Sequence, residues 1–232
     1  MAEDTKVPKH VGIIMDGNRR WAKAHRLPSI QGHAKGVEVL RAITEHAAKS
    51  GVKFLSVYAF STENWRRTEE EVGFLMGLFV KSLAKYLEEL HQQNVRLMML
   101  GSRDGLSDDL LSAWDAAAEK TKDNTGITLA TCWNYGGQQE IIDGVKKMIK
   151  NGIAAESITP ESFGSYLYEG NVIPPVDYVI RTSGEQRSSG FMLWRAAYAE
   201  FYAVDKLWPE FTEADFDAAL EEYATRGRRF GR

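Results

Sequence analysis

An acid, a glycine, an amide and several cations follow the first apolar run of the chain, residues 11–15. Backbone N–H groups near a glycine and planar guanidinium groups suit phosphate oxygens, and a carboxylate suits a hard cation such as Mg²⁺. A turn or helix-cap role is the alternative for the acid. An aspartate nucleophile of the phosphatase type is disfavoured, because an asparagine stands where a second carboxylate is needed. The segment contains Asp16, Gly17, Asn18, Arg19, Arg20 and Trp21.

Similar residue types recur in three later segments, each after an apolar run. They are STENWRR (61–67), WNYGGQQE (133–140) and RTSGEQRSSG (181–190). In three of the four segments, arginines accompany Gly, Ser or Asn, a combination that suits phosphate oxygens. A solvated charged loop is the alternative for residues 181–189. No nucleotide P-loop signature is present, and the combined pattern predicts a polyanionic substrate.

Two further residues are candidates for ligand contact. His33, in IQGHAKG, is equally compatible with a structural role and with a ligand contact. Glu200 lies among apolar residues in AAYAEFY, where a carboxylate needs a metal or an arginine as its partner. No His or Cys spacing is typical of a zinc site.

Short apolar runs alternate with longer amphipathic stretches, which predicts an α/β fold with a mostly parallel central sheet flanked by helices. In such sheets, ligands bind at the carboxyl ends of strands, where the four polar segments lie. No linker or repeat is visible, so residues 1–232 are expected to form a single domain. The expected strands cover 11–15, 54–60, 95–100, 127–132 and 178–181. The expected helices lie near 36–50, 70–93, 107–122, 138–150, 160–168 and 213–225.

Composition limits the classes of function. The net charge of −3 over 232 residues gives no reason to expect nucleic-acid binding. The single cysteine, Cys132, excludes an internal disulfide and fits a reducing cytoplasm. The polar N-terminus lacks a signal-peptide core, and no stretch approaches the roughly 18 apolar residues that span a bilayer. A lipid substrate would therefore need an internal groove or an interfacial surface. Apolar residues in 70–93 predict core packing and leave room for such a groove.

Together, these segments resemble the cis-prenyltransferase family, in the family's order from His10 to Gly231. The resemblance implies repeated condensation of isopentenyl diphosphate onto an allylic diphosphate, with farnesyl diphosphate as the expected starter, to give a long, undecaprenyl-like Z-polyprenyl diphosphate. It also implies Mg²⁺, a homodimer with a hydrophobic tunnel in each subunit, peripheral membrane contact during product release, and a cell-wall lipid carrier as the product's use. The matching motifs are HVGIIMDGNRRWAK, GHAKG, YAFSTENWRR, NYGG, VIRTSGEQRSSGFMLW, YAEFY and RRFG.

The resemblance also implies roles for individual residues. Asp16 organises Mg²⁺ between the two diphosphates, Glu200 is a second metal ligand, and Asn64 lies near the reacting carbons. The segment 226–232 reaches the partner subunit through Arg228, Arg229 and Gly231, whereas residues 1–9 are expected to be flexible. The substrate-binding residues implied are Gly17, Asn18, Arg19, Arg20, Trp21, His33, Ser61, Glu63, Trp65, Arg67, Arg181, Arg187 and Ser189.

Four positions depart from the family pattern. Ser29 stands where many members have an arginine on the allylic diphosphate, and Arg19 or Arg26 is expected to substitute in part. The other departures are Gly190 for asparagine, Gln138 for arginine and Arg195 for glutamine. They bear on the allylic substrate more than on the reaction class.

Product length is expected to depend on the tunnel wall. Ala59 is small near the tunnel entrance, which favours a long product, and Gln93, Val95 and Ile127 align with its far end, with Ile127 as the floor. Three alternatives remain open: a synthase of short or irregularly joined prenyl diphosphates, a non-catalytic partner subunit of the same fold and, more distantly, a phosphatase.

Overall fold

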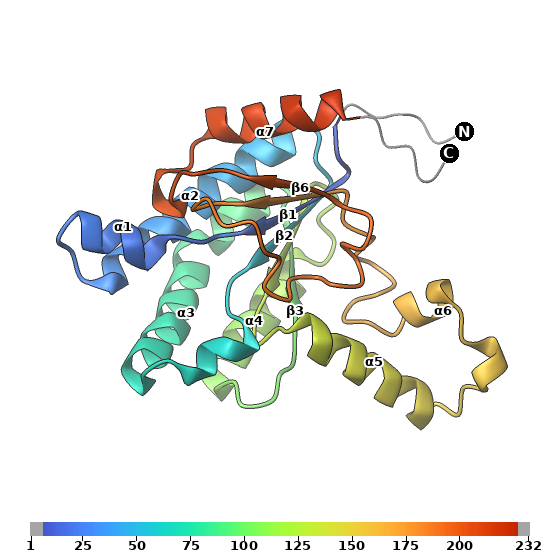
Figure 1. Ribbon diagram of the computed structural model, residues 1–232. Helices are drawn as coiled ribbons and strands as arrows, with labels where there is room; N and C mark the ends of the chain where they lie inside the picture. Colours follow the sequence, from blue (N-terminus) through green and yellow to red (C-terminus); the bar gives the residue numbers. More distant parts are fainter. Residues whose placement is uncertain (1–6, 227–232) are drawn as a thin grey trace.

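The computed structural model describes residues 7–226 and contains a six-stranded sheet at its centre (Figure 1). The strand order is β3-β4-β2-β1-β5-β6, and every neighbouring pair is parallel. The prediction of an α/β domain with a mostly parallel sheet is therefore confirmed. The strands are β1 (His10–Ile14), β2 (Phe54–Tyr58), β3 (Arg96–Leu100), β4 (Thr128–Cys132), β5 (Tyr178–Arg181) and β6 (Glu200–Ala203).

The central strands form because short apolar runs are buried on both faces of the sheet. Side chains alternate between two cores: Ile13 and Ile180 enter one, and Ile14 and Val179 enter the other. Long helices cover the first core. Irregular chain, including Ile173 and Phe191 of adjoining loops, covers much of the second.

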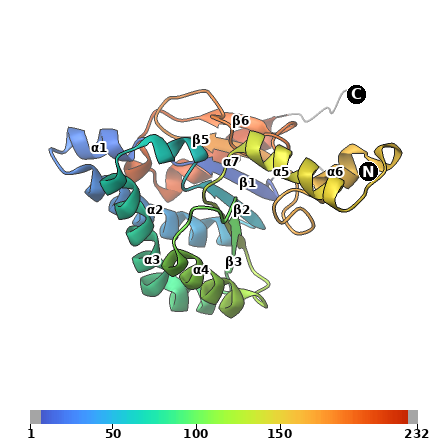
Figure 2. The same cartoon turned by 90° about the horizontal axis from the view of Figure 1, so that it is seen from below.

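The helices cover 7 to 24 residues, apart from the five-residue α6. Hydroxyl groups of Thr68, Ser107, Thr159 and Thr212 accept hydrogen bonds from the first turns of four helices, which satisfies N–H groups otherwise left unpaired there. Figures 1 and 2 place α1 at one end of the molecule and the α5–α6 pair at the opposite end. The helices are α1 (Asn18–Ala24), α2 (Ser29–Lys49), α3 (Glu69–Gln92), α4 (Asp108–Thr121), α5 (Gly137–Lys150), α6 (Pro160–Gly164) and α7 (Glu213–Thr225).

The start of the chain differs most from the sequence-based expectation. Helix α1 was not predicted, and α2 begins at Ser29, seven residues before the expected start near 36. A Cβ atom at Gly32 would lie 2.1 Å from the carbonyl oxygen of Asn18, so glycine permits the close contact of α1 with α2. Gly36, where the helix was expected to begin, likewise lies within α2, and a Cβ atom there would lie 2.5 Å from Oδ1 of Asn18.

Two smaller differences lie in the C-terminal third. Strand β6 was not predicted, because AEFYA was considered only for its acid, and α6 ends at Gly164 rather than near residue 168. At the N-terminus, Val7 packs against the first core, and the carbonyl of Lys9 accepts hydrogen bonds from the N–H groups of Lys53 and Phe54. The part of the expected flexible segment that is described is thus attached to the sheet. Over residues 7–226, no helix combines the length and apolar character needed to cross a membrane.

Candidate active site

The carboxyl ends of β1 and β5 carry the first and last of the four polar segments. β1 lies between β2 and β5. The chain forms β2, β3 and β4 on one side of β1 and then crosses to β5 on its other side, which makes this edge a topological switch point. Arg181, the last residue of β5, donates from Nη2 to Oδ2 of Asp16 at 2.8 Å. The structure therefore joins two segments that the sequence only predicted to share an edge.

Arg181 also organises the loop that follows β5. Its Nη1 donates to the carbonyl oxygen of Arg187 and, at 2.8 Å, to Oγ of Ser189. The Arg187 side chain is exposed and pairs with Glu185 at 2.5 Å. The predicted group of Arg181, Arg187 and Ser189 is thus brought together, with one buried arginine holding the loop and one arginine facing solvent.

Two arginines determine the charge state of Asp16. Its burial opposes ionisation, but the hydrogen bond and charge of Arg181 outweigh this effect, and Arg20, at 3.5 Å, adds to them. The pKa of Asp16 is consequently held below its usual value, and the side chain is ionised at neutral pH. An ionised carboxylate beside two guanidinium groups is suited to a site where a cation and an anion meet.

Helix α1 places further cations at this edge. Gly17 precedes it with φ of 111°, a left-handed conformation that turns the chain sharply from β1 into the helix. The N-terminus of this helix and its cationic side chains face the same hollow. Sequence reasoning missed Lys23, which also lines the hollow; helix-forming residues after Gly17 were the available signal. The α1 side chains and the following turn contribute Arg19, Arg20, Lys23 and Arg26.

The beginning of α3 supplies an acid to the same region. Glu71 accepts a hydrogen bond from Arg67 at 2.8 Å, and it lies 3.9 Å from Arg19 and 4.0 Å from Nε2 of His33. Burial lowers the pKa of His33 to about 4, helped by the neighbouring charges of Arg67 and Arg19 and opposed by Glu71. His33 is therefore neutral at pH 7. Glu71 was not singled out from the sequence, because three consecutive glutamates give no signal of which one faces inward.

Several buried polar atoms at this edge have no hydrogen-bond partner within residues 7–226. They include Oδ1 of Asn18, Nε2 of His33 and Nε of Arg181. Buried polar groups in folded proteins are nearly always paired, so a group of unpaired ones needs an explanation. Asn18 and His33 line a hollow, as expected where a polar ligand completes the hydrogen bonding, and Arg181 adjoins this hollow through its contact with Asp16.

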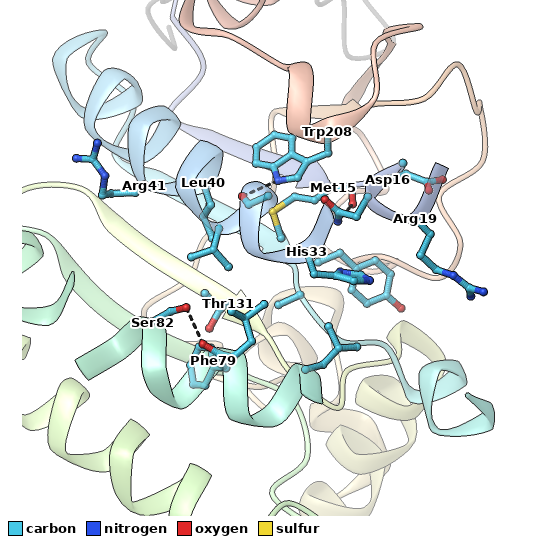
Figure 3. Close-up of a pocket in the computed structure, with 18 of the residues that line it drawn as sticks. Met15, Asp16, Arg19, His33, Leu40, Arg41, Phe79, Ser82, Thr131 and Trp208 are labelled. Carbon is cyan, nitrogen blue, oxygen red and sulfur yellow. Dashed lines mark hydrogen bonds between the residues drawn. The ribbon is translucent and has the colours of Figure 1, made fainter. Parts of the chain in front are cut away.

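The hollow continues into a cavity of about 1020 Å³ between the sheet and helices α2 and α3. In Figure 3, Asp16 and Arg19 lie at one end, while Leu40, Phe79 and Thr131 line the part farther from them. The sheet and helices supply a mostly apolar wall in that part, interrupted by Thr44, Ser82 and Thr131. This wall includes Leu75, Leu78, Phe79, Leu83, Leu90, Leu97, Trp114 and Leu129.

The residues that line the cavity differ in part from those expected to line the tunnel. Ala59 lines it, as predicted. Leu129 lines it as well, whereas Ile127, two residues earlier on the same face of the sheet, is buried in the core and is not part of the lining. Val95 is likewise a core residue. The expected floor at Ile127 is thus replaced by Leu129 and its neighbours in this structure.

The residues predicted in segment 61–67 divide into two groups. Asn64 and Arg67 line the cavity, and Oδ1 of Asn64 accepts a hydrogen bond from the N–H of Ser61 at 3.1 Å. Trp65 donates to Oδ1 of Asn134 at 2.7 Å, and Glu63 is exposed. The second group, Ser61, Glu63 and Trp65, therefore does not line the cavity.

Two other predicted residues, Trp21 and Glu200, do not line the cavity. Trp21 packs against His25 with ring centroids 4.4 Å apart and the rings tilted by 31°. Glu200 begins β6, whose parallel register places it three residues before Ala203, the partner of Arg181. At about 3.3 Å per residue, the Cα atom of Glu200 is roughly 10 Å along the sheet from the strand end that carries Arg181. Its side chain pairs with Arg226 at 2.7 Å, one of the two partners expected for it. The predicted contacts of Arg228, Arg229 and Gly231 fall outside the described residues.

The four departures have different structural contexts. Ser29 lines the cavity beside Arg26, and Gln138 is exposed. Gly190 has φ of 78°, a left-handed conformation that glycine and asparagine both adopt readily. Arg195 is buried and forms an ion pair with the buried carboxylate of Glu140. The last two therefore have local structural reasons.

The residues at the cavity mouth are compatible with Mg²⁺. This ion typically takes one or two protein carboxylates and completes its shell with phosphate oxygens and water. Asp16 supplies one ionised carboxylate at the edge of the hollow, with Oδ1 not engaged in a hydrogen bond shorter than the 3.5 Å contact to Arg20. No group of three or more acidic, His or Cys side chains suited to a metal occurs within residues 7–226, so the protein alone offers an incomplete shell.

Comparisons with known proteins agree with this geometry. Residues 14–231 match the family model described as putative undecaprenyl diphosphate synthase. The chain belongs to the undecaprenyl diphosphate synthase family. The isoprenyl transferase of Thermotoga maritima is 47% identical over 228 residues, covering 97% of each protein. That of Neisseria gonorrhoeae is 46% identical over 230 residues, covering 99% of this chain and 92% of the relative.

Solved structures of this family have the same fold. Lavandulyl diphosphate synthase from Lavandula x intermedia, in complex with dimethylallyl diphosphate, matches with a TM-score of 0.94 and 34% identity, covering 98% of this chain and 99% of that one. A probable undecaprenyl diphosphate synthase from Campylobacter jejuni matches with a TM-score of 0.82 and 30% identity, covering 97% and 99%. The protein is thus an isoprenyl transferase with the cis-prenyltransferase fold.

Proposed function

We propose that this isoprenyl transferase condenses isopentenyl diphosphate with an allylic diphosphate, farnesyl diphosphate being the preferred starter, and builds a long Z-polyprenyl diphosphate. One observation carries the proposal: a mouth with cations and unpaired polar atoms opens directly into a large apolar cavity. This combination suits a substrate with a charged head and an apolar tail. Family membership supports the reaction class.

The mouth residues stabilise the charge that develops when the allylic C–O bond breaks. The backbone N–H groups of Gly17 and Asn18 at the start of α1, together with Arg20, would hold the allylic diphosphate, while Arg181 and Ser189 would hold isopentenyl diphosphate. Preorganised donors at the departing diphosphate lower the barrier most, since its negative charge grows in the transition state. A bound Mg²⁺ held by Asp16 would supply further neutralisation of that charge.

The remaining residues align the reactants and exclude water. Asn64 and Arg67, at the cavity rim, would close over the two reacting carbons. Apolar walls keep water from the allylic cation, which would otherwise be quenched as an alcohol. Neutral His33 can accept a hydrogen bond or donate one at the diphosphate without changing the net charge.

Product length would follow from the apolar part of the cavity. Its volume of about 1020 Å³ lies at the upper end of the range for small-ligand pockets, about 300–1,000 Å³, and supports a long product. We expect Ala59→Leu, which adds bulk to the lining, to shift the products to shorter chains. Chain lengths resolved by chromatography measure this, and an unchanged product ladder would contradict the assignment of the cavity to the tail.

A homodimer and peripheral membrane contact belong to the same proposal. Helix α5 presents Ile142, Val145 and Ile149 on one face, and 41–73% of each side chain is exposed. An apolar stripe at this spacing supports a subunit interface. In the same proposal, this dimer makes a cell-wall lipid carrier in the cytoplasm.

A second candidate is a synthase of short prenyl diphosphates. The TM-score of 0.94 to lavandulyl diphosphate synthase favours it, and the serine at position 29 allows an altered allylic site. The two candidates share the diphosphate mouth and differ in how much of the apolar cavity the product fills.

The deciding experiment supplies purified protein with Mg²⁺, labelled isopentenyl diphosphate and, separately, dimethylallyl, geranyl or farnesyl diphosphate. A long product ladder primed best by farnesyl diphosphate supports the proposal. A single short product favours the second candidate. A folded protein that forms no product with any primer contradicts both and favours a non-catalytic partner subunit, while phosphate release without isopentenyl diphosphate would identify a phosphatase.

A further inference from the structure

A second hollow of about 780 Å³ lies on the outer side of α2, between that helix, α3 and the start of α7. Its lining is amphipathic. Val39, Ala42 and the buried Phe211 supply its apolar lining, and Lys35, Glu38, Glu89 and Glu213 supply charged groups. We refer to this hollow as the outer groove.

The outer groove and the main cavity share two side chains, Arg41 and Tyr86. These residues come from facing positions on α2 and α3, and the Arg41 guanidinium lies 6.0 Å from the Tyr86 ring centroid. Arg41 also pairs with Glu89 of α3 at 2.6 Å. Together the three residues form the seam that separates the two hollows.

The seam lies away from the reacting end. In Figure 3, Arg41 and Asp16 are at opposite sides of the cavity, and the Arg41 side chain points out of it, whereas neighbouring Leu40 points inward. A chain that grows by insertion at the diphosphate end pushes its oldest, apolar units away from that end. Those units therefore move toward the seam.

We propose that the outer groove binds the distal isoprenoid units of a growing product, which leave the main cavity between Arg41, Tyr86 and Glu89. This inference rests on the proposed condensation reaction and deepens it, by assigning the far part of the tail to a site outside the cavity. The seam is then the boundary between products that stay enclosed and products that extend beyond the enclosed cavity.

The contacts across the seam are weak enough for the growing tail to separate them. Arg41 and Glu89 are 34% and 40% exposed, and ion pairs in such positions contribute little to stability. Glu45 lies 3.7 Å from the same guanidinium group, so Arg41 keeps a carboxylate partner when Glu89 moves away. On the outer side, the emerging tail meets Val39, Ala42 and Phe211 rather than water, which favours its burial.

A fluorescent reporter in the outer groove tests the site directly. Ala214 is exposed and lines the groove, whereas Ala218, one turn later on α7, is exposed and does not line it. The natural Cys132 is buried, so a cysteine introduced at either position is the accessible thiol for labelling. Ala214→Cys and Ala218→Cys would each carry an environment-sensitive dye, with Mg²⁺ present in every sample.

We expect undecaprenyl diphosphate to shift the emission of the dye at position 214 to the blue, and farnesyl diphosphate to leave it unchanged. The dye at position 218 should respond to neither. The proposal is overturned if undecaprenyl diphosphate gives no shift at 214, or the same shift at both positions. A shift with phosphatidylcholine vesicles alone would assign the groove to a membrane lipid and overturn it as well.

Product analysis gives a second, independent test. In Ala214→Trp, the indole should fill the groove and reduce the share of the longest products about tenfold, the effect of leaving about two methylene groups unburied. The rate of the first condensation should stay unchanged, and Ala218→Trp should match the unsubstituted enzyme. Identical ladders for the two variants would count against the groove. If the unsubstituted enzyme forms no product, the proposed function fails, while the dye experiment still decides the binding site.

Discussion

Two arginine–carboxylate pairs of this protein are built from the same chemical groups and differ in what surrounds them. The pair of Asp16 and Arg181 lies at the cavity mouth, where Nε of Arg181 has no partner within residues 7–226. The pair of Glu140 and Arg195 lies between α5 and the loop before β6, with both residues at most 4% exposed.

The buried pair has its hydrogen-bonding groups filled by the protein. Oε2 of Glu140 accepts from the Tyr135 hydroxyl at 2.6 Å, and Oε1 accepts from Arg195 and, at 3.3 Å, from the N–H of Tyr168. Arg195 also donates to the carbonyl oxygens of Tyr168 and Ile173. No ligand is needed to complete this network, which ties a helix to two loops.

The difference supports the proposal that the pair of Asp16 and Arg181 serves binding and that the pair of Glu140 and Arg195 serves structure. A pair that folding leaves incomplete, beside a hollow, retains hydrogen-bonding capacity for a ligand. When folding completes the hydrogen bonding of a buried pair, removing either partner destabilises the protein, because the other charge would stay buried alone. The two regions should therefore respond in opposite ways to substitution.

The largest expected effect is on catalysis at the mouth. Asp16→Asn keeps the side-chain shape and removes the charge, and we expect kcat to fall about 10²–10³-fold, the usual cost of losing one group that stabilises developing charge. The melting temperature should change little. Steady-state kinetics and thermal unfolding measure the two. A large loss of stability with unchanged kcat would reverse the roles assigned to the two pairs.

The next effect is on stability at the buried pair. Arg195→Met leaves Glu140 buried without its cation, and we expect the free energy of unfolding to fall by about 3–5 kcal/mol, or roughly 10 °C in melting temperature. The kcat of the folded fraction should be retained. Adding Glu140→Gln in the same chain should recover part of the loss. No recovery in this double variant would show that Arg195 stabilises through contacts other than the ion pair.

A smaller effect is expected from the cations near Ser29. Arg26→Ala, and separately Arg19→Ala, should raise the KM for the allylic diphosphate about tenfold, the cost of losing one charged hydrogen bond. The KM for isopentenyl diphosphate should stay constant, which distinguishes the allylic site from the Arg181 loop. An unaltered allylic KM in both variants would refute the substitution of either residue for the missing arginine.

The smallest effect concerns pH. The pKa of His33 is lowered to about 4 in the folded state, so between about pH 6.5 and pH 4 the unfolded chain takes up a proton that the folded chain does not. The free energy of unfolding should therefore fall with decreasing pH, by less than about 1 kcal/mol between pH 7 and pH 6 for each histidine with such a lowered pKa. Burial also lowers the pKa of His10 to about 4. His33→Gln should roughly halve the slope of unfolding free energy against pH; an unchanged slope would mean that His33 is not buried as described.

The sequence predicted the sheet more completely than the site. Parallel strands are visible in the sequence as isolated apolar runs, and the residue types at their ends predicted polyanion chemistry and a shared edge for the segments of Asp16 and Arg181. The ion pair between these two residues was not predicted. Helix α1 was not predicted, because a segment with these arginines is equally compatible with a loop. The placement of Glu71 and the partner of Arg195 depend on helix orientation across long sequence separations, which single-sequence patterns do not contain.

The contact between Asp16 and Arg181 joins residues 165 positions apart in the chain. During synthesis, the segment after β1, which we propose binds phosphate, therefore exists long before Arg181 has been made. A nascent or C-terminally truncated chain carries a mouth without its principal cation, and it gains that cation only when β5 pairs with β1. The candidate site is therefore complete only in a chain whose last strands have joined the sheet.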